Sequence, residues 1–145
     1  MGRIGKDLQV KVMDLQLAPG ILEQVILHAK QAYPKEGCGL LAGRGGAERF
    51  IGMKNLSGSA AEYEMDPAEL IHVLRGLRDS GERLMAIYHS HPHGPAELSK
   101  EDVDRAYYPE AAQLLVSLAD LERPQCAAFR IVDGLPLQIE LHVIV

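Results

Sequence analysis

The chain has 145 residues, of which 47% are hydrophobic and 24% charged, and its formal net charge is −5. A chain of this length can bury a core of its own, so we expect a single domain over residues 1–145. Because the acidic charge is spread along the chain and nucleic-acid binders usually show a basic face, nucleic acid is not an expected partner.

Targeting and redox signals are weak. No apolar run reaches the length of a membrane-spanning helix, and Met1–Lys6 has no apolar stretch behind it that would make a signal peptide. The two cysteines, Cys38 and Cys126, do not form a disulfide framework. We therefore expect a cytoplasmic protein with no membrane partner. The oligomeric state stays open, a homodimer included.

The first half of the chain predicts a helix followed by a hairpin. Apolar residues recur at helical spacing over Ile21–Ala32, and Pro34 follows. An apolar run at Gly37–Ala42 predicts a buried strand, Arg44–Gly46 a turn, and Glu48–Asn55 the returning strand.

A second helix is predicted after a loop at Asn55–Ala61. Asp66 suits the N-cap, Pro67 the first helical position, and Glu69 the reciprocal capping partner. Gly81 is a natural stop. The buried stripe of this helix is expected to consist of Leu70, Val73, Leu74 and Leu77.

The region around His-Ser-His-Pro predicts a strand that ends in a loop. Arg83–His91 is the strand, and Pro92 prevents its pairing from continuing. A short helix is predicted to begin at Ser99 and to end before Pro109.

The C-terminal region is rich in strand signals. Gln113–Leu118 and Ala127–Val132 are apolar runs, and Asp133-Gly134 marks a turn. Alternation over Leu137–Val143 indicates a strand with one buried face. Together the elements predict an α/β fold, with about three helices around a mixed, largely antiparallel sheet.

The residues with the clearest chemistry are His89, His91 and Asp102. Alternate side chains of a strand share a face, so both imidazoles can reach one metal ion at about 2.0–2.1 Å. Asp102 offers a third ligand from the following helix, which leaves a fourth position for water, as in catalytic zinc sites. Glu36 is the candidate base. Taken alone, His-x-His is weak evidence, Ser99–Asp102 also fits a plain helix start, and no substrate is selected.

Read together, these positions resemble the JAMM motif of the MPN-domain metalloproteases, in their compact prokaryotic branch. That motif has an upstream glutamate, then His-x-His, seven residues, Ser, two residues and Asp. This chain meets it without a departure in spacing at Glu36, His89, His91, Ser99 and Asp102. The similarity extends over most of residues 17–132.

The resemblance implies a fold, a metal and roles for these residues. The fold would be an MPN-like domain with a cytidine-deaminase-like architecture. His89, His91 and Asp102 would hold Zn²⁺, and Glu36 would act as general base on the zinc-bound water. Ser99 would donate a hydrogen bond to the oxyanion of the tetrahedral intermediate.

The resemblance also implies a substrate class. Relatives hydrolyse a peptide or isopeptide bond that follows the C-terminal Gly-Gly of a ubiquitin-like protein, and the compact branch acts on sulfur-carrier proteins. The leaving group stays open between cysteine, a short peptide and a protein lysine. The alternative is a catalytically silent MPN-type scaffold, which metal analysis would distinguish. A zinc nucleobase deaminase is set aside because the chain lacks His-x-Glu and Pro-Cys-x-x-Cys.

Overall fold

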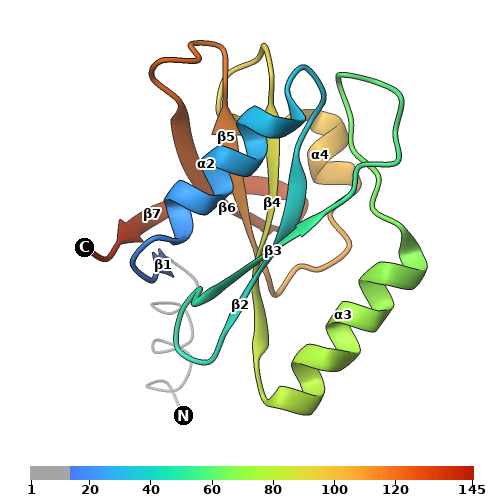
Figure 1. The fold of residues 1–145 in the computed structure, drawn as a ribbon, viewed down its shortest axis with the longest axis vertical. Helices are drawn as coiled ribbons and strands as arrows, with labels where there is room; N and C mark the ends of the chain where they lie inside the picture. The colour runs from blue at the N-terminus through green and yellow to red at the C-terminus, as the bar shows by residue number, and fades with distance from the viewer. Residues whose placement is uncertain (1–13) are drawn as a thin grey trace.

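A computed structural model describes residues 14–145, which form a seven-stranded sheet with helices packed against it (Figure 1). The interpretation of Met1–Lys6 lies outside these residues. The strands are β1 (Asp14–Leu17), β2 (Cys38–Gly43), β3 (Arg49–Met53), β4 (Arg83–His91), β5 (Ala112–Ser117), β6 (Gln125–Val132) and β7 (Leu135–Val143), and the helices are α2 (Ile21–Ala32), α3 (Pro67–Ser80) and α4 (Lys100–Asp104).

The sheet is mixed and largely antiparallel. Its strand order is β1-β7-β6-β5-β4-β2-β3. The β1–β7 and β4–β5 pairs are parallel, and the remaining neighbours are antiparallel. The fold class predicted from the sequence is therefore confirmed. The parallel β4–β5 pair matters most for the site, because it places the His-Ser-His end of β4 inside the sheet between β2 and β5.

Helix α2 covers one face of the sheet (Figure 1). Ile21, Val25 and Ala29 follow one another at intervals of four residues, so they share a stripe that is fully buried in the core. That stripe packs in one cluster with Tyr88 of β4 and Leu114 of β5. The helix has the bounds that the periodicity predicted.

Helix α3 packs on the opposite face, in a cluster with β2, β3 and β4. Pro67 is its first residue, and Gly81 ends it with a φ of 75°, which glycine adopts at little cost. The Asp66 side chain accepts a hydrogen bond from the Ala68 amide at 3.0 Å. The reciprocal bond predicted for Glu69 is wrong, because within the described chain the cap engages the second helical amide and Glu69 points to solvent.

The outer end of the sheet differs from the prediction in two ways. The four-residue strand β1 was missed, because its parallel pairing with the distant β7 leaves no local signal in the sequence. In β7, Ile139 is buried, but Leu135, Leu137 and Val143 are 69%, 42% and 39% exposed. The prediction of one buried face is therefore correct only for the middle of β7, because the ends of this strand extend beyond the packed core.

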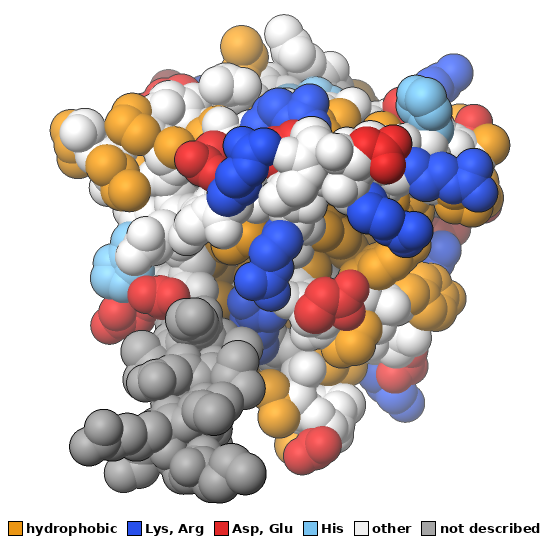
Figure 2. Space-filling model, turned by 90° about the horizontal axis from the view of Figure 1, so that it is seen from below, with side chains coloured by type: hydrophobic (Ala, Val, Ile, Leu, Met, Phe, Trp, Pro, Cys, Tyr) orange, Lys and Arg blue, Asp and Glu red, His pale blue; other side chains and the backbone are white. Residues whose placement is uncertain are grey.

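The predicted turn at Asp133-Gly134 is confirmed, with φ values of 52° and 75° that match a two-residue hairpin. Within residues 14–145, no helix is both long and apolar enough to cross a bilayer. The face seen from below carries Lys and Arg side chains interspersed with Asp, Glu and apolar ones (Figure 2). On this face neither sign of charge dominates.

Candidate metal centre

His89 and His91 project together from the end of β4. Their Nε2 atoms lie 3.2 Å apart. His89 is 1% exposed and pairs across the sheet with Cys38 on one side and Leu115 on the other. The prediction that these two imidazoles share a face of the strand is confirmed by this geometry.

The loop after β4 fixes the orientation of His91. Its Nδ1 lies 2.8 Å from the carbonyl oxygen of Pro95, which can only accept, so Nδ1 carries the proton and donates it. Nε2 then faces His89 and Asp102. Such a bond to the distal nitrogen is what orients a metal-binding histidine.

Asp102 reaches the same point from α4. Its Oδ1 lies 3.3 Å from His89 Nε2 and its Oδ2 3.2 Å from His91 Nε2. Burial alone would raise the pKa of this carboxyl, but the bonds from His89 and His91 outweigh burial and hold it well below its usual range. Burial lowers the pKa of His89, whereas the bonds of His91 to Asp102 and Pro95 overcome burial and raise its pKa.

The helix start that presents Asp102 is a capping box. Ser99 is the N-cap, and its Oγ accepts a hydrogen bond from the Asp102 amide at 3.1 Å. In return, Asp102 Oδ2 accepts one from the Ser99 amide at 2.9 Å. Because the Ser99 hydroxyl is the acceptor in this bond, its own proton stays available. The helix-start and functional readings of Ser99–Asp102 are thus compatible.

The spacing of these donor atoms suits a small metal ion. A tetrahedral ion with ligands at about 2.0–2.1 Å requires ligand atoms about 3.3 Å apart. The distances from His89 Nε2 to His91 Nε2 and from each nitrogen to the nearer Asp102 oxygen are 3.2–3.3 Å. Two imidazoles and a carboxylate are donors that zinc accepts, so the residues present fit such an ion.

Glu36 completes the cluster from the loop before β2. A carboxylate oxygen of Glu36 and one ring nitrogen each of His89 and His91 all lie within 4.8 Å of one another. Glu36 is 3% exposed, and its Oε1 has no hydrogen-bond partner among residues 14–145. Burial is the main cause that raises the pKa of Glu36 to about 7, with Asp102 adding to it and His91 opposing it. A carboxylate with this pKa can take up and release a proton near neutrality.

The backbone around Glu36 is held from two sides, by residues outside the predicted motif. Asn55 Nδ2 donates to the Glu36 carbonyl at 2.9 Å. Ser90 Oγ accepts from the Gly37 amide at 2.7 Å, and the Ser90 amide donates to the Gly37 carbonyl at 3.0 Å. Gly37 is required here, because a Cβ would collide with the Tyr88 hydroxyl. The only available signal for Ser90 was its place between the two histidines.

Tyr63 was also missed. Its ring stacks on the His89 imidazole with centroids 4.7 Å apart and an interplanar angle of 28°. It lies in the loop before α3, which Asn55 ties down by accepting hydrogen bonds from the Ser57 and Glu64 amides. One asparagine therefore contacts both the Glu36 backbone and the loop over His89.

Other residues whose side chains could bind a metal lie outside the cluster. Cys38 is fully buried, its Sγ lies 3.6 Å from the Met53 carbonyl, and burial raises the pKa of its thiol to about 12. His28 contacts the Tyr88 hydroxyl at 3.1 Å on the opposite face of β4. His93 packs edge-on against Tyr33. Cys38 is thus a small buried thiol that packs as an apolar residue.

Residues 19–132 match the family described as prokaryotic homologs of the JAB domain. The chain belongs to this family. The match covers most of the chain, including every residue of the cluster, and the JAMM/MPN resemblance inferred from the motif is confirmed.

Two similar proteins are named as a peptidase and as a probable protease. The chain is 35% identical over 133 residues to the CysO-cysteine peptidase of Mycobacterium tuberculosis, covering 90% of this chain and 91% of that one. It is 43% identical over 93 residues to the probable TtuB-protein conjugate cleaving protease of Thermus thermophilus, covering 63% of each. The solution structure of protein DSY2949 from Desulfitobacterium hafniense superposes with a TM-score of 0.80 at 33% identity, covering 90% and 93%.

Proposed function

We propose that this chain is a zinc-dependent peptidase that hydrolyses the peptide or isopeptide bond after the C-terminal Gly-Gly of a ubiquitin-like sulfur-carrier protein. The observation that carries this is the convergence of His89, His91 and Asp102, whose facing nitrogen and oxygen atoms lie 3.2–3.3 Å apart, with the buried Glu36 carboxylate beside them. The relatives named for cleaving CysO-cysteine and TtuB conjugates support the substrate class.

In the proposed mechanism, His89, His91 and Asp102 would hold the metal ion. Zinc at this position would supply Lewis acidity, which lowers the pKa of water and polarises a carbonyl group. The buried carboxylate of Glu36, one oxygen of which has no partner in the described part of the chain, takes the proton of the attacking water and delivers it to the leaving amine. The hydroxyl of Ser99 donates to the oxyanion, and the capping box fixes its place.

The test separates metal binding from hydrolysis. Purified protein should hold about one zinc per chain, and His89→Ala, His91→Ala and Asp102→Ala should each lose it. Glu36→Gln should keep the metal and lose hydrolysis of a carrier protein that ends in Gly-Gly-Cys, followed by mass spectrometry. Retained hydrolysis in Glu36→Gln would overturn the mechanism.

Exposed residues provide matched controls. Glu97→Gln makes the same chemical change as Glu36→Gln, at a solvent-exposed loop position. His72→Ala makes the same change as the two histidine variants, on the exposed side of α3. Both should keep zinc and hydrolysis. A protein that takes up no zinc on reconstitution would favour the catalytically silent scaffold instead.

Other expectations from the sequence stay predictions. They are the single domain over residues 1–145, the cytoplasmic location, the absence of nucleic-acid and membrane partners, and the choice between monomer and homodimer. Size-exclusion chromatography with light scattering measures the last of these directly.

A further inference from the structure

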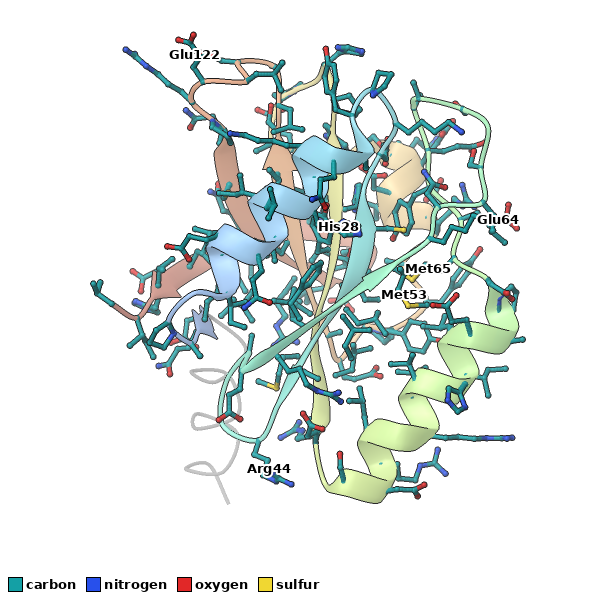
Figure 3. The ribbon with its side chains drawn as sticks, viewed as in Figure 1. His28, Arg44, Met53, Glu64, Met65 and Glu122 are labelled. Carbon is teal, nitrogen blue, oxygen red and sulfur yellow. The ribbon has the colours of Figure 1, made fainter. Side chains whose placement is uncertain are left out.

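A cavity of about 300 Å³ lies beside Asp102, between the loop at 61–65, the start of α3 and the segment that follows α4. Figure 3 shows Met65 next to Met53 on the inner side of that loop, and Glu64 pointing outward. Apolar and aromatic side chains make up most of the lining, among them Leu40, Tyr63, Met65, Leu70, Ile87 and Tyr108.

Gln113 is the polar residue at the floor of this cavity. Leu40 pairs with Ile87, and Ile87 pairs with Gln113, so the three side chains form one row across β2, β4 and β5. Gln113 is 4% exposed and lines the cavity. A buried amide is stable only where its donor and its acceptor find partners. The floor therefore offers both a donor and an acceptor to an occupant of the cavity.

The cavity is continuous with the metal centre. Asp102 lines the cavity and also contacts both histidines, and Tyr63 lines it while stacking on His89. The row of Leu40, Ile87 and Gln113 lies two residues before His89 along β4, a distance of about 7 Å. Two extended residues of a bound peptide span about the same distance.

Resting on the function proposed above, we propose that this cavity binds the side chain of the substrate residue that precedes Gly-Gly, and that Gln113 selects an uncharged side chain with a hydrogen-bonding end. The two glycines cover the distance from the scissile bond to the cavity. A charged end would need a counter-charge at the floor, where Gln113 offers only an amide. The ion pair of Glu62 with Arg105, at 3.2 Å, is half-exposed at the rim.

The experiment compares tail peptides that end in X-Gly-Gly-Cys, with X as Gln, Leu or Lys. Binding to the metal-free protein is measured by calorimetry, and hydrolysis by the zinc-loaded protein is measured separately. We expect Gln to bind about tenfold more tightly than the similarly sized Leu, the difference that one hydrogen bond makes. Lys should bind more weakly than Gln.

Gln113→Leu should reverse the order of Gln and Leu, and its thermal midpoint should show that it folds. Gln138→Leu, the same change at an exposed position of β7, should bind as the wild type does. An unchanged Gln-to-Leu ratio in a folded Gln113→Leu variant would overturn the inference, as would equal binding of all three peptides. Metal-free binding with the expected order, but no hydrolysis by the zinc-loaded protein, would refute the proposed activity and support the cavity's role.

Discussion

At the scale of single residues, the burial of Glu36 has two consequences, one for its pKa and one for stability. The loss of solvent that raises its pKa to about 7 makes it a suitable base, and the same loss makes its charged form unfavourable in the folded chain. The proposed general base is thus held at a cost in stability. Asn55 and Ser90, which hold the backbone at Glu36 and Gly37, keep the side chain in place.

Metal-free Glu36→Gln should be more stable than the wild type at about pH 8. Because the folded-state pKa is raised, protonated Glu36 contributes stability below about pH 4.5, and that contribution is lost as the pH rises through about 7. The gain should be roughly 2–3 kcal/mol at pH 8 and approach zero below pH 4.5. Urea unfolding in the presence of a chelator measures it, with Glu97→Gln as control. Equal stabilities at pH 8 would contradict the shift.

Substitutions of Ser99 should separate its cap from its proposed catalytic hydroxyl. Ser99→Ala removes both and should lose about 1 kcal/mol of stability together with a rate loss of about 10²–10³-fold. Ser99→Gly should lose only a few tenths of a kcal/mol, since glycine is tolerated at an N-cap, yet show the same loss of rate. Ser99→Thr should restore both. Wild-type turnover in Ser99→Gly would refute the oxyanion role.

At the scale of elements, the predicted bounds agree with the structure where the sequence signal lies within the element or directly beside it. The bounds of α2 and β4 follow from apolar periodicity and from prolines, and the start and stop of α3 follow from Asp66-Pro67 and Gly81. The reciprocal bond of Glu69 failed, because a choice between adjacent amides depends on side-chain rotamers that a motif does not specify.

Asp66→Ala should destabilise the protein by about 1 kcal/mol, because the Ala68 amide loses its acceptor. Asp66→Asn keeps an oxygen acceptor and should stay within a few tenths of a kcal/mol of the wild type. Zinc content should be unchanged in both variants, since α3 contributes no donor to the metal centre. Chemical denaturation and metal analysis together check this.

At the scale of the whole molecule, the sheet brings distant segments to one point. Glu36 comes from the loop before β2, the histidines from β4, and Asp102 from α4. The order β5-β4-β2 places these segments side by side, with the core of α2 behind them. The stability of that core therefore determines whether the site exists.

Leu114→Ala should cost about 2–5 kcal/mol, because Leu114 is fully buried on the central strand β5. Leu137→Ala removes the same atoms from a side chain that is 42% exposed on β7, and should cost no more than about 1 kcal/mol. Thermal or urea unfolding measures both. Similar losses in the two variants would contradict the finding that the alternating residues of β7 are only partly core.

The sequence by itself determined the elements with strong local periodicity, the motif residues Glu36, His89, His91, Ser99 and Asp102, and through them the family. Periodicity, caps and motif spacing are properties of neighbouring residues, so they can be read without a fold. Tertiary structure alone decided that β1 pairs with β7, that Tyr63 stacks on His89, that Asn55 and Ser90 hold the backbone at Glu36 and Gly37, and that Gln113 faces a cavity. The physical reason is that these contacts join residues far apart in the chain, and only packing of the sheet brings them together.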